Sequence, residues 1–365
     1  MFMLEKRCLV AVLVLAMLFV GCAPQREYGG PPGTQPPSQE GPPGENPNGP
    51  ADGSQQTAPE SLEVTLPPTG DVSIYKGFWM PAMGFDDSQQ SMSGVTALKD
   101  AGANIVAIGP NVKINSVGDV KMDAPLDFLD RRLSELTKRY YSDGIRVCLV
   151  IETLYVDDFS EQTPAGGPTA FPEDIASKPG FLDKYNLMVV DVAKLAEKYH
   201  VEIFSPMNEP DMKLGGKVAS DWGQQVLPLV RKNYSGKVLW KSTPSADRYD
   251  INFKGYDIIG IDISPGGGPQ SLQTYPQYVG GILDSILSSA ERDNVPDVMF
   301  TEFGVWGGAL SLSEDDKAVA HRIVFEQGKG KVKGFFVLDP PPDLDRSLKG
   351  TKTYDEVKLW FKEKL

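Results

Sequence analysis

Two glutamates, 93 residues apart, lie at the ends of apolar stretches of the chain. Glu209 follows the run 201–207 in the tripeptide Asn208-Glu209-Pro210, and Glu302 lies near the end of the run 297–303. Each run has the length of a buried parallel strand, and the carboxyl ends of such strands meet at one face of a closed barrel. Two carboxyl groups brought together there can cleave a glycosidic bond, because one protonates the leaving oxygen while the other attacks or stabilises the anomeric carbon.

The alternative for Asn208-Glu209-Pro210 is a plain turn from strand to loop. In that interpretation the proline restricts the backbone and water solvates the glutamate. The second run repeats the same layout of an apolar strand with a glutamate at its end. This repetition favours a catalytic pair over two solvated turn residues.

The elements that must position these glutamates are apolar runs of strand length, which alternate with amphipathic stretches of helix length after Gly70. This alternation is typical of repeated β-α units and a parallel sheet. Eight such runs lie at about residues 75–80, 104–109, 146–152, 201–206, 237–242, 257–263, 297–303 and 332–338. The sequence therefore predicts an α/β fold, a (β/α)8 TIM barrel over residues 71–365. The alternative is a doubly wound open sheet, but the sequence has neither a dinucleotide-binding fingerprint nor a Walker motif.

Two helices of this barrel are clear from their spacing. Apolar residues between the third and fourth runs recur every three or four positions, which predicts one apolar stripe against the sheet. They are Phe181, Leu182, Tyr185, Met188, Val189, Val192, Leu195, Ala196 and Tyr199. The last helix has the same pattern in Tyr354, Val357, Trp360 and Phe361. Only about fourteen residues separate the fifth and sixth runs, so a short helix or none is expected there.

Residues 1–70 do not have the pattern of a folded core. Residues 1–21 have a charged start and an apolar run, and Gly21-Cys22 at its end resembles a lipoprotein signal in which the cysteine is lipidated. An ordinary signal peptide with a chance cysteine is the alternative. Residues 22–70 are rich in proline and glycine and have almost no large apolar side chains, so they are expected to form a disordered linker.

The expected location is therefore extracytoplasmic, with the cell membrane reached only through a lipid anchor on Cys22. The formal net charge of −13 argues against nucleic acid as a partner. The domain from residue 71 is expected to fold and act without the linker.

Metal and cofactor chemistry have little support in the sequence. The two histidines, His200 and His321, show no paired ligand spacing. Cys148 lies in an apolar run, where a cysteine usually packs as part of the core. The sequence predicts no metal site and no cofactor.

Met207-Asn208-Glu209-Pro210 and Phe300-Thr301-Glu302-Phe303-Gly304 resemble the motifs of glycoside hydrolase clan A, whose members are eightfold barrels. In that clan an Asn-Glu pair follows strand four and a nucleophilic glutamate follows strand seven. The resemblance covers about Ser73 to Leu365 and implies that Glu209 is the general acid/base and Glu302 the nucleophile. It also implies that Asn208 hydrogen-bonds the sugar 2-hydroxyl. The segment around Glu302 is nearest to families 5 and 53.

The sequence departs from the clan at three strand ends. The arginine often found near strand two is missing, which leaves Asn111 or Lys113 as candidates for substrate contact. A tyrosine often orients the nucleophile from the end of strand six, and Tyr275 is the candidate to replace it. Strand eight ends in Leu338-Asp339-Pro340 instead of a tryptophan.

Aromatic side chains after other strands are candidates for stacking on sugar rings. Trp79 after strand one and Trp306 after strand seven are the expected substrate-binding residues, while Tyr155 and Trp222 are weaker candidates. The prediction is a retaining glycoside hydrolase, endo-acting on a β-linked glycan or on oligosaccharides, with β-glucan, β-mannan and β-galactan all open. The alternative is a carbohydrate-binding lipoprotein with a degenerate, non-catalytic barrel. The three departures from the clan lend support to this alternative.

Overall fold

The structure is a computed structural model of the 365-residue chain. It describes residues 64–80, 94–159, 171–172, 174–244, 250–263, 272–304, 312–339 and 348–365. The chain divides into two units, residues 1–58 and 59–365, and every described residue belongs to the second. Cys22 and Trp306 lie outside the described residues.

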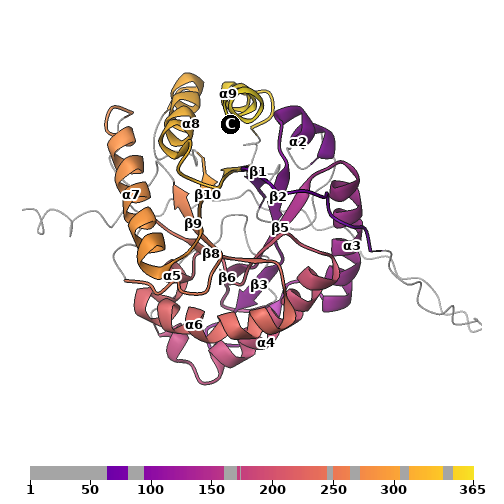
Figure 1. Ribbon diagram of the computed structural model, residues 1–365. Coiled ribbons are helices and arrows are strands. Elements are labelled where there is room, and N and C mark those ends of the chain that lie inside the picture. The colour runs from indigo at the N-terminus through magenta and orange to yellow at the C-terminus, as the bar shows by residue number, and fades with distance from the viewer. Residues whose placement is uncertain are drawn as a thin grey trace, which may run out of the picture. The chain divides into compact units, whose positions relative to one another are not determined.

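Eight parallel strands close into a barrel, which confirms the predicted fold and excludes the open sheet (Figure 1). The order around the barrel is β1-β11-β10-β9-β8-β7-β5-β2. The strands are Tyr75–Trp79 (β1), Ile105–Ile108 (β2), Arg146–Val150 (β5), Ile203–Ser205 (β7), Lys237–Ser242 (β8), Ile258–Ile263 (β9), Asp297–Phe303 (β10) and Gly334–Leu338 (β11). Each lies within one of the eight apolar runs, because a strand covered by helices on one side and by the barrel interior on the other is buried on both faces.

Helices surround the barrel (Figure 1). They are Val95–Ala101 (α2), Leu126–Ser142 (α3), Phe181–Lys198 (α4), Pro210–Leu214 (α5), Gly216–Asn233 (α6), Tyr275–Asp293 (α7), Glu314–Gly328 (α8) and Lys352–Leu359 (α9), with a 3₁₀ turn at Ile175–Ser177 and a π-helical turn at Trp360–Lys364. Among the described residues between β8 and β9, none is helical, as the short spacing predicted.

The apolar stripes bury as predicted. Helix α4 turns Phe181, Tyr185, Val189 and Val192 into the core. At the end of the chain, Tyr354, Val357, Trp360 and Phe361 are buried as well. The period of 3.6 residues per turn was sufficient to predict the buried face of these helices, because each packs one face against the sheet.

Strands two and three of the barrel continue into a small second sheet. Its strands are Asn111–Ile114 (β3), Val120–Met122 (β4) and Glu152–Tyr155 (β6), in the order β4-β3-β6. Where β2 leads into this sheet, a Cβ on Gly109 would lie 1.6 Å from the carbonyl oxygen of Val150, so only glycine fits. Asn111 and Glu152 are register partners at the start of this sheet.

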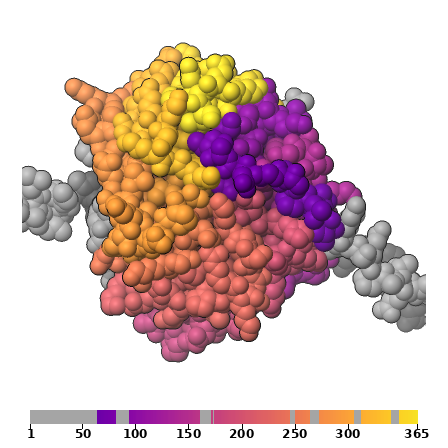
Figure 2. Space-filling model, in the orientation of Figure 1, coloured from indigo at the N-terminus to yellow at the C-terminus, as the bar shows by residue number. Residues whose placement is uncertain are grey.

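Residues 64–70, expected to belong to the linker, include contacts to the barrel. The Arg146 guanidinium donates hydrogen bonds to the carbonyl oxygens of Pro68 at 3.1 Å and Gly70 at 2.7 Å, and it pairs with Glu202 at 3.5 Å. Arg146 begins β5, so this stretch lies at the amino ends of the strands, opposite the expected site. Figure 2 shows it in indigo, crossing one face of the barrel.

We therefore expect two truncations to differ in stability. A chain beginning at Val64 should have the melting temperature of the longer protein, whereas a chain beginning at Asp71 should melt several degrees lower. The second truncation removes three carbonyl acceptors, those of Pro68, Thr69 and Gly70, from a buried guanidinium. Hydrogen bonds to charged groups contribute roughly 1.5–3 kcal/mol each, less whatever water restores. Thermal unfolding of both chains measures this, and equal melting temperatures would show that the boundary lies at residue 71.

Candidate active site

Glu209 is positioned by backbone hydrogen bonds that extend β7 beyond Ser205. The N–H of Asn208 donates to the carbonyl oxygen of Ile151 at 2.8 Å, and the N–H of Glu209 donates to that of Lys241 at 3.1 Å. Glu209 has φ 49° and ψ 54°, a left-handed conformation that is unfavourable for a residue with a side chain and before proline. Such strain, maintained by the surrounding hydrogen bonds, is concentrated at functional sites.

Glu302 is positioned by a β-bulge in β10. Phe300 pairs with Ile261 of β9, but Glu302 pairs with Asp262, so β10 has one more residue than its neighbour. The extra residue is Thr301, whose hydroxyl donates to Oδ1 of Asp262 at 2.8 Å. The bulge therefore places Glu302 directly beside Asp262, and bulges commonly redirect side chains at active sites.

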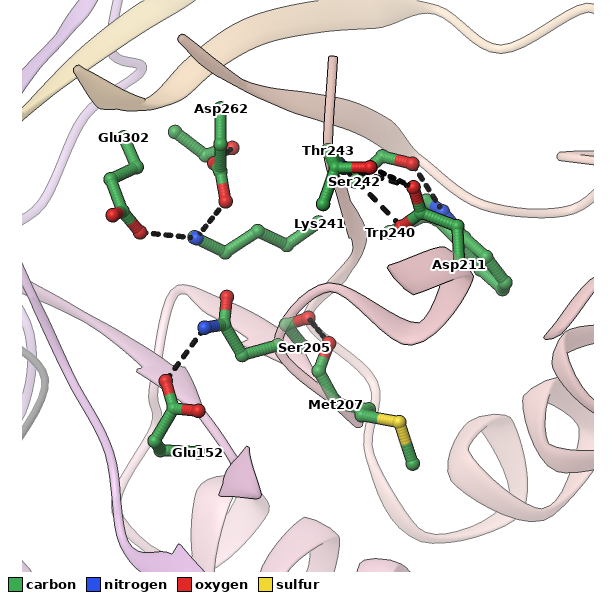
Figure 3. A network of polar contacts seen from close by, with 12 residues as sticks. Glu152, Ser205, Met207, Asp211, Trp240, Lys241, Ser242, Thr243, Asp262 and Glu302 are labelled. Carbon is green, nitrogen blue, oxygen red and sulfur yellow. Dashed lines mark hydrogen bonds and ion pairs between the residues drawn. The ribbon is translucent and has the colours of Figure 1, made fainter. Parts of the chain in front are cut away.

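Lys241 links the two glutamates. Its ammonium donates to Oε2 of Glu302 at 2.9 Å and to Oδ2 of Asp262, while its backbone oxygen accepts from the N–H of Glu209. Figure 3 shows this side chain extending between Asp262 and Glu302. Glu209 and Glu302, predicted from strand ends alone, are thus held at the same end of the barrel.

A second ion pair lies beside the first. Glu152, at the start of β6, accepts from the ammonium of Lys213 at 2.6 Å and from Nδ2 of Asn208 at 2.6 Å. Because a carboxylate only accepts, the amide nitrogen of Asn208 must face Glu152. Its oxygen, Oδ1, is buried and has no hydrogen-bond partner among the described residues. Asn208 thus presents an acceptor to the site.

The turn that carries Glu209 is tied to the end of β8. Asp211, two residues after Glu209, accepts from the backbone N–H of Thr243 at 3.1 Å and from the hydroxyl of Thr243. Asp211 is buried. Burial without such partners would be costly, so these bonds restrict the path of the turn.

The surroundings of Glu209 favour its protonated form. Burial raises the pKa of Glu209 to about 7, Lys241 opposes this rise, and the negative charge of Glu302 adds to it. Lys213 and Glu152 act on it more weakly, with opposite signs. A glutamic acid that keeps its proton near neutral pH is suited to general-acid chemistry.

Lys241 remains an ammonium. Burial lowers its pKa, but the charges of Asp262, Glu302 and Glu209 outweigh burial, and the net change is upward. Burial also raises the pKa of Asp262, against the pull of Lys241. A lysine that remains protonated serves as a charge and a hydrogen-bond donor, and it is a poor nucleophile.

The raised pKa of Glu209 predicts a pH-dependent effect on stability. The folded protein holds this proton up to about pH 7, and the unfolded chain releases it near the ordinary value of 4.5. The stabilising contribution is complete below 4.5 and is lost as the pH rises through 7. We expect Glu209→Gln, which stays neutral, to raise the melting temperature more at pH 8 than at pH 4.5. An equal change at both pH values would mean that Glu209 titrates as a solvated residue.

The other predicted substrate contacts lie in varied surroundings. Asn111 is partly exposed and lines a small surface hollow with Pro110, Met122 and Asp123. Tyr275 begins α7, where it is buried and stacks on Tyr278 with ring centres 6.0 Å apart. The described side chain that contacts Glu302 is Lys241.

The two described tryptophans of the prediction are both buried. Trp79 is 1% exposed, and its ring centre lies 5.2 Å from the ammonium of Lys241. Trp222 lies on the buried face of α6, where its indole N–H donates to Oδ1 of Asn186 at 2.9 Å. Trp79 therefore lies next to the charged cluster, whereas Trp222 is a packing residue.

Lys241, Asp262 and Glu152 were missed in the sequence, although each left a signal. Lys241 and Asp262 are charged residues that follow three or more uncharged residues inside two of the runs, and Glu152 ends another. Lysine and aspartate are almost never fully buried unless they are paired. Two charges of opposite sign inside consecutive predicted strands therefore indicate an ion pair in the barrel.

The described residues contain neither a metal-binding cluster nor a membrane-spanning helix. No group of three or more histidine, cysteine or carboxylate side chains there is arranged to hold a metal ion. Within the same ranges, no helix combines the length and the apolar character that are needed to cross a membrane.

No family model and no curated protein matches the sequence. Among solved structures, the chain is similar to a GH113 β-1,4-mannanase, with 17% identity, a TM-score of 0.59 and coverage of 80% of this chain and 100% of that one. The GH113 β-mannanase of Alicyclobacillus acidocaldarius is 16% identical, with a TM-score of 0.61 and coverage of 80% of this chain and 98% of that one. A β-glucuronidase of Faecalibacterium prausnitzii is 16% identical, with a TM-score of 0.54 and coverage of 80% of this chain and 49% of that one.

At these identities the similarity is one of fold. The chain has the (β/α)8 barrel that glycosidases of clan A share, as its strand pattern predicted. Because one fold can carry many activities, the geometry of the site itself defines what each side chain can do.

Proposed function

We propose that the protein is a retaining glycoside hydrolase that cleaves β-linked glycans or oligosaccharides. The single observation that carries this proposal is that Lys241 binds two glutamates whose surroundings differ. Glu302 accepts from its ammonium, while Glu209, held by its carbonyl oxygen, has its pKa raised to about 7. A carboxyl group that keeps its proton near neutral pH, beside a second one that is held by a cation, is what double displacement requires.

In the first step, a carboxylate oxygen of Glu302 attacks the anomeric carbon and the bond to the leaving oxygen breaks. Glu209 gives its proton to that oxygen. In the second step, the oxygen of water attacks the anomeric carbon, Glu209 takes one proton from this water, and the ester bond to Glu302 breaks. Both glutamates return to their initial states, and the sugar keeps its configuration. Asn208 presents Oδ1 as an acceptor for a sugar hydroxyl.

The charge of the site favours neutral sugars over uronic acids. Glu152, Glu209, Asp262 and Glu302 gather here with two lysines, Lys213 and Lys241. Both lysines are already paired with these carboxylates. A sugar carboxylate would need a cation of its own, and among the described residues of the site none is left for it. Mannans and glucans therefore fit this site better than glucuronides.

A substrate panel tests the proposed function. Purified protein is incubated with β-mannan, β-1,4-glucan, β-galactan, their oligosaccharides and matched aryl β-mannoside, β-glucoside, β-galactoside and β-glucuronide. We expect turnover of at least one neutral β-glycan, with the β-anomer as the first product by proton NMR and with little glucuronide cleavage. An α-anomer as the first product would exclude retention. Binding of a glycan with no turnover on any substrate would favour the alternative, a barrel that only captures carbohydrate.

We also propose that the enzyme is lipid-anchored outside the cytoplasmic membrane. The support is Gly21-Cys22 at the end of the apolar run and the proline-rich stretch after it. Replacing Cys22 by serine should move the protein from the detergent phase to the aqueous phase in a phase-partition assay. Partition of the serine variant into detergent would contradict the anchor, and Cys148→Ser, far from the signal, is the matched control.

A further inference from the structure

Lys241 is a charged side chain in the interior of the barrel. It is 0% exposed and lies on the inward face of β8, two residues after the buried Leu239. Its ammonium contacts Asp262, Glu302 and the ring of Trp79. Cys148 and Glu209 also lie near enough for its charge to act on them.

The stability of the fold does not explain this lysine. An ion pair loses its hydration when it is buried, and apolar residues of similar volume commonly serve a core equally well or better. Apolar packing of this kind fills the neighbouring interior of the barrel, where the buried residues include Ile105, Ile203, Leu239 and Ile258. The ion pair of Lys241 lies where the strands end beside the two glutamates, which indicates a requirement of the site.

We propose that Lys241 is a positioning residue for the nucleophile, and that its ammonium, anchored by Asp262, holds Glu302 ionised with one oxygen directed toward the sugar. This inference rests on the proposed function. The ammonium occupies Oε2 of Glu302, which leaves Oε1 to attack. Asp262 is the anchor because it is itself restrained by the hydroxyl of Thr301.

The charge of Lys241 also suits the second step. Once Glu302 has become a neutral ester, the ammonium has lost one of its counter-ions. Its charge then acts on Glu209 with less opposition and favours the carboxylate form, in which Glu209 accepts a proton from water. One fixed cation thus supports both glutamates in turn.

The test compares Lys241→Met, Lys241→Met/Asp262→Asn and the control Lys237→Met. Lys237 lies on the same strand at its other end, in a partly exposed pair with Asp297. For Lys241→Met we expect kcat to fall by about 10²–10³-fold with little change in KM, the size of effect seen when one preorganised donor is removed. We also expect the low-pH limb of kcat/KM to move upward by about one unit or more, because Asp262 and Glu302 remain as neighbouring carboxylates that share a proton.

The double variant separates charge from orientation. Removing the charge of Asp262 as well should return the low-pH limb toward that of the wild type while kcat stays low, because nothing holds Glu302. It also keeps the test valid if Lys241→Met does not fold, since it leaves one carboxylate beside the lost ammonium, Glu302, instead of two. Lys237→Met should keep the wild-type kcat and pH profile. A folded Lys241→Met with the wild-type kcat or the wild-type low-pH limb overturns the proposal.

A readout independent of turnover is the melting temperature between pH 5 and pH 8. Relative to the wild type, Lys241→Met should lose stability as the pH rises, because the two neighbouring carboxylates ionise, and the double variant should not. If the wild type cleaves no β-glycoside, the proposed function fails, and this comparison still decides whether Lys241 neutralises the pair. Parallel curves for the single and double variants overturn the inference on their own.

Discussion

Glu302→Ala is expected to lower kcat on an aryl β-glycoside by about 10⁴-fold or more, because it removes the group that forms the covalent intermediate. Sugar binding should survive, since Lys241, Asn208 and Glu209 remain. Added azide should restore turnover by entering the space left by the carboxylate. The product should be the α-glycosyl azide, of inverted configuration, and NMR identifies it.

Two further variants make this result specific. Glu302→Gln keeps the volume of the side chain and should show the same loss, which separates chemistry from a packing defect. Glu135→Ala, at an exposed position on α3, should leave kcat unchanged. Wild-type turnover by Glu302→Ala on a glycan substrate would remove Glu302 from the mechanism.

Glu209→Ala is expected to separate substrates by their leaving groups. On a natural glycan, whose leaving oxygen needs a proton, kcat/KM should fall by about 10²–10⁴-fold, the usual contribution of a positioned acid. On a dinitrophenyl β-glycoside, whose leaving group needs little protonation, we expect a loss of less than about tenfold. Azide should then give the β-glycosyl azide, because Glu302 still forms the intermediate and azide displaces it.

The pH profile provides a second measurement on the same residue. Because burial raises the pKa of Glu209 to about 7, the wild-type kcat/KM on a natural glycan should decline as the pH rises above 7, when the acid loses its proton. Glu209→Ala should lack this decline. Equal losses on both leaving groups, with the high-pH decline retained, would assign the proton donor to another residue.

Much of the barrel could be predicted without its structure. All eight strands lie within the apolar runs because parallel strands, buried on both faces, consist mostly of apolar residues. The stripe on α4 was readable for a similar reason, since a helix over one sheet buries one face. Glu209 could be placed because the end of a strand is a local feature of the sequence.

The neighbours of these glutamates could not be predicted in the same way. Whether Lys241 and Asp262 meet Glu302 depends on how β8, β9 and β10 are aligned, and the extra residue at Thr301 shifts that alignment by one position. A shift of one residue changes which side chains share a face, and no local pattern marks it.

The sequence by itself thus determined the closed barrel and the strand ends at which its two glutamates stand, because burial and strand length are local properties of the chain. Only the tertiary structure decided that a lysine from β8, one of the two strands between them, binds one glutamate through its side chain and the other through its backbone. That arrangement depends on register, on a bulge and on closure of the barrel, which bring together residues 61 positions apart.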